Sequence, residues 1–159
     1  MKPRSRAVRI RKYAVTAYQR TALRSLMPPD DITVSEWAER YRILDTKAAA
    51  LPGPWNNDKT PYLVGIMDEF CNYETEEIVF CKPTQVGGTE AELNMLGWLI
   101  QQDPAPTMCV YPSDTLAKSL TANRLQPMLY ASESLRERYR ENESTKEELQ
   151  FDGMYLSMV

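Results

Sequence analysis

A glycine-rich loop at residues 82–89 carries the residue types that bind phosphate groups. Its sequence is KPTQVGGT, and it follows a short apolar run, IVFC, at residues 78–81. A helix-like pattern begins directly after the loop. The order of strand, glycine loop and helix is typical of a phosphate-binding P-loop. The loop therefore predicts a site for the phosphates of a nucleotide.

The loop departs from the usual P-loop pattern, G-x-x-x-x-G-K-[ST], at two positions. Lys82 stands where the first glycine belongs, and Gly88 stands where the lysine belongs. Gly87 and Thr89 fit the pattern. The lysine has thus moved from the end of the loop to its start, a rarer arrangement than the motif itself.

The variant loop keeps the chemistry of phosphate binding. Gly87 and Gly88 allow a tight turn and a close approach of the backbone to an anion. The N–H groups from Val86 to Thr89 can form one concave nest, and the positive end of the following helix adds to it. Lys82 would supply the cation, and the Thr89 hydroxyl would ligate Mg²⁺ beside the phosphates of ATP. The alternative is a plain Gly-Gly turn with Lys82 in solvent, and the loop alone does not decide between the two.

The composition excludes several other kinds of site. The 159-residue chain is long enough for one domain with a core, and it has three cysteines and no histidine. A histidine-based triad or a histidine zinc site is therefore excluded within this chain, and no cysteine pair has metal-site spacing. Unpaired cysteines favour a reduced, cytoplasmic compartment. No apolar stretch approaches the ~18 residues that a membrane span needs.

Positive charge is concentrated at the start of the chain. Residues 1–24 contain eight Lys or Arg and no acidic residue, and the other 135 residues have a net charge of −11. We expect residues 1–30 to form a basic helical arm, with the helix itself at residues 7–26. The arm predicts a contact with DNA, RNA or an acidic protein, and a disordered solubilising tail is the alternative.

The remaining pattern predicts an α/β fold with parallel strands flanked by helices. A capping box at residues 33–36 begins one helix. The predicted elements are helices at 33–41, 61–70, 89–102, 113–124 and 131–149, strands at 76–81 and 107–111, and a hairpin at 149–159. An ATPase also needs a strand that ends in acidic residues, and residues 107–159 contain none. We therefore expect residues 31–159 to be the first part of a larger ATPase domain. This part would end before the acidic strand end that is called Walker B.

Four blocks, in this order, resemble the lambda-type phage terminase large subunit, the ATPase that packages DNA into phage heads. The resemblance covers roughly residues 30–130. The blocks are TVSEWAERYR at 33–42, LPGPWNNDKTPYLVGIMDEF at 51–70, EEIVFCKPTQVGGTEAELNMLGWLI at 76–100 and DPAPTMCVYPSDTLAKSLTANRLQPML at 103–129. The lysine at the start of the loop is itself a habit of this family. The Walker B acids and the nuclease domain of the family are absent from the chain.

The resemblance implies the cofactors ATP and Mg²⁺. It also implies that the full-length protein has double-stranded DNA, the small terminase subunit and the portal as partners. The full-length protein would form an oligomeric motor with an endonuclease activity that cuts DNA. The implied nucleotide-binding residues are Lys82, Gln85, Val86, Gly87, Gly88 and Thr89, with Trp55 and Tyr62 near the adenine and Thr89 on the metal. Trp55 and Tyr62 have a plainer alternative, which is packing on the core.

Two other functions fit the same residues. A helicase-like ATPase would share the α/β layout, but it would favour lysine at position 88. A catalytically inactive prophage remnant would bind partners without turnover. We expect the 159-residue chain by itself to hydrolyse no ATP, because it has a phosphate cradle without the second acid.

Overall fold

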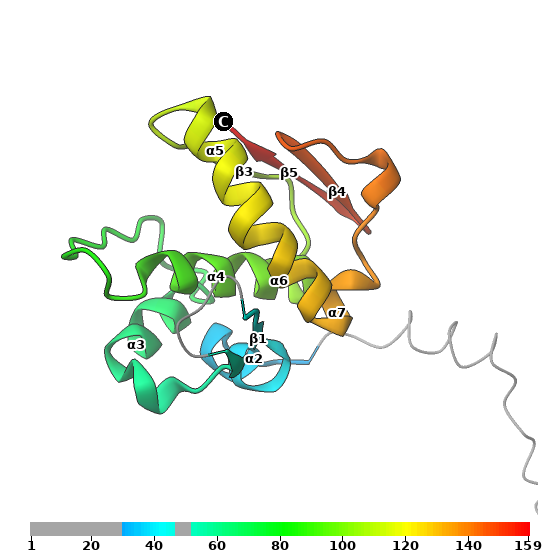
Figure 1. Ribbon diagram of the computed structural model, residues 1–159. Helices are drawn as coiled ribbons and strands as arrows, with labels where there is room; N and C mark the ends of the chain where they lie inside the picture. Colours follow the sequence, from blue (N-terminus) through cyan, green and yellow to red (C-terminus); the bar gives the residue numbers. More distant parts are fainter. Residues whose placement is uncertain (1–29, 47–51) are drawn as a thin grey trace, which may run out of the picture.

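The computed structural model describes residues 30–46 and 52–159, and its elements are drawn in Figure 1. The predicted basic helix at 7–26 lies outside these residues. Helix α4 (Gly88–Gln102) lies in the middle of the molecule, with α2 (Val34–Tyr41) and α3 (Pro61–Glu69) packed against it. A longer helical rod, which includes α5 and α6, crosses it on the other side, and a small sheet lies beyond the rod.

Helix α2 (Val34–Tyr41) begins at the predicted capping box. The Glu36 N–H donates to the Thr33 hydroxyl at 3.4 Å, and the Thr33 N–H donates to the Glu36 carboxylate at 3.2 Å. Val34, Trp37 and Ala38 lie on the buried face of the helix. The prediction of this helix and of its first residue is confirmed.

A short hairpin and a second helix follow α2. Strand β1 (Ile43–Leu44) pairs antiparallel with β2 (Gly53–Pro54), and the 3₁₀-helix η1 (Asn57–Lys59) leads into α3 (Pro61–Glu69). Asp68 accepts hydrogen bonds from the backbone N–H and the hydroxyl of Ser35, both at 2.9 Å, which ties α3 to α2. Helix α3 occurs where it was predicted.

Helix α4 (Gly88–Gln102) is the predicted apolar helix, and it is buried on nearly all sides. Trp37 donates from its indole N–H to Gln101 at 2.9 Å, and Trp98 donates to the carbonyl of Ile32 at 2.7 Å. Polar indole groups are therefore satisfied where the rings enter the core. The core thus fixes the helix whose first turn forms the end of the glycine loop.

The rod that crosses α4 is longer than predicted. It consists of α5 (Asp114–Leu120), one π-helical turn η2 (Thr121–Leu125) and α6 (Gln126–Ala131), whereas the pattern predicted an end at residue 124. Pro127 has no N–H, and its ring would clash with the carbonyl four residues earlier in an α-helix. The wider π-turn, in which the Gln126 N–H donates to the Thr121 carbonyl, precedes this proline and lets the rod continue.

The charged helix predicted at residues 131–149 is wrong. Only α7 (Glu133–Arg136) and the 3₁₀-helix η3 (Glu141–Glu143) form there. Leu135 is buried, but the many charged residues after it offer no apolar stripe that would hold a longer helix against the core. The chain instead runs through turns into the sheet.

The sheet is mixed rather than parallel throughout. Its strands β3 (Thr107–Cys109), β4 (Glu148–Phe151) and β5 (Met154–Met158) have the order β3-β5-β4. Strands β4 and β5 form the predicted hairpin around Asp152 and Gly153 and pair antiparallel, while β3 pairs parallel with β5. The α/β class is therefore confirmed, with a mixed sheet in place of the predicted parallel one.

The strand predicted at residues 76–81 is wrong. The segment is extended, but it joins no sheet in the described part of the chain. Val79 is 81% exposed, so water is available to its backbone groups where a neighbouring strand was expected. Met108 of strand β3 is 64% exposed, because helices cover only one face of the sheet.

Candidate functional site

The glycine loop turns sharply into helix α4. Gln85 has a φ of 62° and Gly87 a φ of 79°, both in the left-handed region. Gly87 is the N-cap residue, and no side chain caps the first turn of this helix. The N–H groups of that turn therefore point out of the helix without a side-chain acceptor, which is the arrangement that favours an anion.

The side chain of Lys82 lies across Gly88. A Cβ atom placed on Gly88 would lie 2.2 Å from Cε, 2.4 Å from Cδ and 3.1 Å from Nζ of Lys82. Real side chains cannot approach so closely, so position 88 has to be glycine while the lysine takes this path. The two departures from the usual loop pattern are thus connected. The lysine comes from position 82, and its side chain occupies the space that a side chain at position 88 would need.

All eight residues that the sequence predicted for nucleotide binding line one cavity of about 580 Å³, which we call the loop cavity. They are Trp55, Tyr62, Lys82, Gln85, Val86, Gly87, Gly88 and Thr89. Segments more than 20 residues apart in the sequence therefore meet around the loop. The cavity has the size of a small-molecule site.

The two aromatic residues of the loop cavity differ in exposure. Trp55 is only 8% exposed and belongs to the core, and its indole N–H donates to Asn57 at 2.7 Å. Tyr62 is 54% exposed, and its hydroxyl donates to the carbonyl of Val86 at 3.1 Å. Trp55 thus packs as the plainer alternative predicted, whereas Tyr62 holds the loop and leaves its ring open to the cavity.

The loop cavity also contains residues that sequence reasoning did not assign to it. They are Lys59, Thr60, Glu90 and Arg124, with several apolar neighbours. The hydroxyl of Thr60 is buried without a hydrogen-bond partner in the described structure. Their spacing along the sequence does not assign them to the site, because tertiary packing brings them to the loop.

Glu90 lies between two arginines. One carboxylate oxygen contacts the buried Arg42 at 2.8 Å, and the other contacts Arg124 at 3.4 Å. Arg42 also donates to Asn94 at 3.2 Å and to the carbonyl of Ile43 at 2.7 Å. Burial lowers the pKa of Arg42, while the charge of Glu90 raises it. This pairing fixes α2, α4 and the helical rod around the end of the loop.

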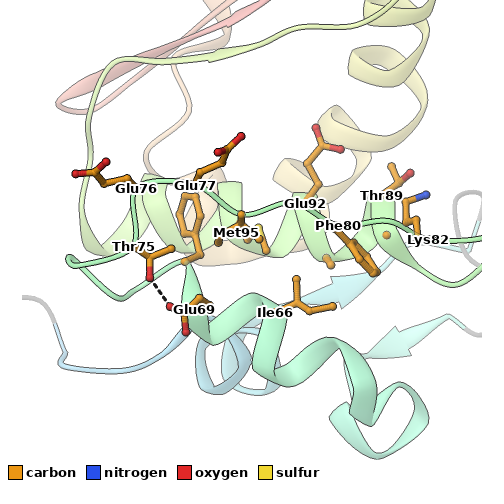
Figure 2. Close-up of a pocket in the computed structure, with 14 residues that line it drawn as sticks. Ile66, Glu69, Thr75, Glu76, Glu77, Phe80, Lys82, Thr89, Glu92 and Met95 are labelled. Carbon is orange, nitrogen blue, oxygen red and sulfur yellow. Dashed lines mark hydrogen bonds between the residues drawn. The ribbon is translucent and has the colours of Figure 1, made fainter.

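A second cavity, of about 620 Å³, lies on the other side of Lys82 and is shown in Figure 2. We call it the acidic cavity, because Glu69, Glu76, Glu77 and Glu92 line it. Hydrogen bonds from Thr75 and Asn72 lower the pKa of Glu69, so this carboxyl is ionised at neutral pH. Four carboxylates and one lysine line the acidic cavity, and this excess of negative charge repels a polyphosphate. The loop cavity has three cations, Lys59, Lys82 and Arg124, and one acid, Glu90, which is already paired.

Two weak acids behind the acidic cavity stay protonated. Tyr111 donates from its hydroxyl to Glu92 at 2.5 Å, and burial and this bond raise its pKa. Burial raises the pKa of the Cys109 thiol to about 11.

Within the described residues no group of three or more His, Cys, Asp or Glu is arranged to hold a metal ion, and no helix there is long and apolar enough to cross a membrane.

Comparison with known proteins points to one family. The sequence model of the phage terminase large subunit gpA, ATPase domain, matches residues 49–159. The large terminase subunit of Enterobacteria phage P21 is 26% identical over 109 residues, and that of Escherichia phage lambda is 25% identical over 112 residues. The first match covers 69% of this chain and the second 70%, but each covers only 17% of the relative. No solved structure matches the chain significantly.

Proposed function

The chain belongs to the phage terminase large subunit family, and on that premise we propose that its loop cavity binds ATP with Mg²⁺. The observation that carries this proposal is the path of Lys82 across Gly88, beside the uncapped first turn of α4. A cation and a row of backbone N–H groups then face one space, which is the donor set that a phosphate chain needs.

Each part of the loop has a defined role in this proposal. The N–H groups of residues 86–89 hold phosphate oxygens, and Lys82 neutralises their charge. The Thr89 hydroxyl holds Mg²⁺ together with the phosphates, and the metal ion supplies further charge neutralisation. Tyr62 supports the loop through Val86 and offers its exposed ring to the base.

In the full-length protein we propose that ATP hydrolysis drives the packaging of double-stranded DNA, in the cytoplasm of the host cell. The small terminase subunit, the portal and an endonuclease activity would belong to that larger assembly, which would be oligomeric. The chain spans 17% of the length of the relatives that it matches, so these activities concern the whole protein.

The test is ATP·Mg²⁺ binding to the chain and to its Lys82→Ala variant, by calorimetry. Loss of a charged contact is worth roughly 1.5–3 kcal/mol, so the affinity of the variant should fall about 10- to 100-fold. Lys146→Ala is the matched control, because Lys146 is an exposed residue that does not line the loop cavity. Equal affinity in the chain and the Lys82 variant would contradict the proposed role of the displaced lysine.

A further inference from the structure

Arg124 reaches the loop cavity from the helical rod, more than 30 residues after the glycine loop in the sequence. It lines the cavity together with Lys82, Gly88 and Thr89. Its side chain is 41% exposed, so the guanidinium is accessible from the cavity. An arginine beside a glycine loop is the residue type that best matches phosphate oxygens, because its planar fork donates two parallel hydrogen bonds.

The local geometry holds Arg124 at this place. It lies in the π-helical turn η2, whose end residues Thr121 and Leu125 are buried. Thr121 also donates from its hydroxyl to the carbonyl of Ala117 at 3.0 Å. Turns of this kind are rare and occur frequently at functional sites. The π-turn therefore carries Arg124 on a part of the rod that is anchored on both sides.

Glu90 gives Arg124 a charged neighbour beside the loop. The contact of Glu90 with Arg42 is shorter, at 2.8 Å, than its contact with Arg124, at 3.4 Å. Arg42 is buried and has further hydrogen bonds, so its ion pair with Glu90 does not depend on the position of Arg124. A shift of Arg124 toward another anion therefore leaves the Glu90 charge balanced by Arg42.

We propose that Arg124 is a second cationic contact for the phosphate chain of the nucleotide, oriented by Glu90. This inference rests on the proposed binding of ATP in the loop cavity. When phosphate enters, the guanidinium turns from Glu90 to the phosphate oxygens, and Lys82 and Arg124 approach the chain from separate elements. The affinity then depends on the number of phosphates, because AMP offers less negative charge than ATP.

The experiment compares ATP·Mg²⁺, ADP·Mg²⁺, AMP and tripolyphosphate as calorimetric ligands of the chain. In Arg124→Gln the affinity for ATP and for tripolyphosphate should fall about tenfold, and the affinity for AMP less than about twofold. Arg136→Gln, on the exposed side of α7, is the matched control and should change none of them. Arg124→Lys keeps the charge but loses the planar fork of donors, so an intermediate loss should result.

The outcomes separate this inference from the proposal on which it rests. Wild-type affinity for ATP in Arg124→Gln, with binding lost in Lys82→Ala, overturns the role of Arg124 and leaves the loop proposal standing. An equal loss for all ligands, AMP included, also overturns it, since that pattern indicates a structural role. If the unsubstituted chain binds neither ATP nor tripolyphosphate, both proposals fail. The Arg124→Lys variant answers the same question should Arg124→Gln not fold.

Discussion

The two cavities beside Lys82 share part of their walls and differ in charge. Lys82, Gly88 and Thr89 line both of them. The loop cavity adds Lys59 and Arg124, and its Glu90 is held by buried Arg42, whereas the acidic cavity adds four glutamates. A glycine loop therefore does not by itself determine the side on which an anion would bind. The charges contributed by distant segments make that choice.

The largest expected effect concerns the stability that Glu90 of the loop cavity provides, compared with an exposed acid outside both cavities. Glu90→Ala leaves the buried Arg42 without its carboxylate, so we expect a loss of about 3–5 kcal/mol in the free energy of unfolding. Urea denaturation measures it. Glu147→Ala is the control, because its pair with Lys118 is about half exposed and should contribute little to stability. A similarly small loss for Glu90→Ala would mean that Arg42 is solvated when its partner is removed.

Gly88 should affect ATP affinity, because the Lys82 side chain passes across it. Gly88→Ala puts a methyl group where the Lys82 side chain lies, and this flexible side chain has to move away. We expect a loss of ATP affinity of about tenfold, or ~1.4 kcal/mol, with little change in stability. Gly65→Ala is the matched control, since a Cβ there meets nothing within 4 Å. If Gly88→Ala binds ATP normally, the path of Lys82 across Gly88 is not required.

Neutralising the acidic cavity should have a smaller effect of opposite sign. The double variant Glu76→Gln, Glu77→Gln removes two exposed negative charges from the cavity that Lys82 also lines. The ATP affinity should rise, by less than about threefold because salt screens exposed charges. A fall in affinity would break the comparison, because it would place the nucleotide among these glutamates.

The smallest difference concerns thiol reactivity. Cys81 is exposed at the start of the loop, while burial raises the pKa of Cys109 to about 11. A raised pKa leaves less thiolate at pH 8, and the thiolate is the reactive form. Iodoacetamide should therefore modify Cys81 first, with the rate at Cys109 rising up to about pH 11. Peptide mass spectrometry measures both rates, and faster reaction of Cys109 at pH 8 would contradict its burial.

Two similar apolar runs show where sequence reasoning ends. Strands were predicted at residues 76–81 and 107–111, yet only the second range contains a strand, β3. A strand exists through hydrogen bonds to a neighbour, and no local pattern states which neighbour is in reach. The hairpin of β4 and β5 was predictable because its neighbour is local, across the turn at Asp152 and Gly153.

The sequence by itself determined the features that depend on neighbouring residues. The capping box of α2, the glycine loop with its displaced lysine and the apolar helix α4 could all be recognised from local spacing. Tertiary structure alone decided which distant residues meet them. Arg42, Glu90 and Arg124 come from three elements, and their pairing depends on how α2, α4 and the rod pack. Electrostatics acts through distance in space, so the charge of each cavity was settled only by the fold.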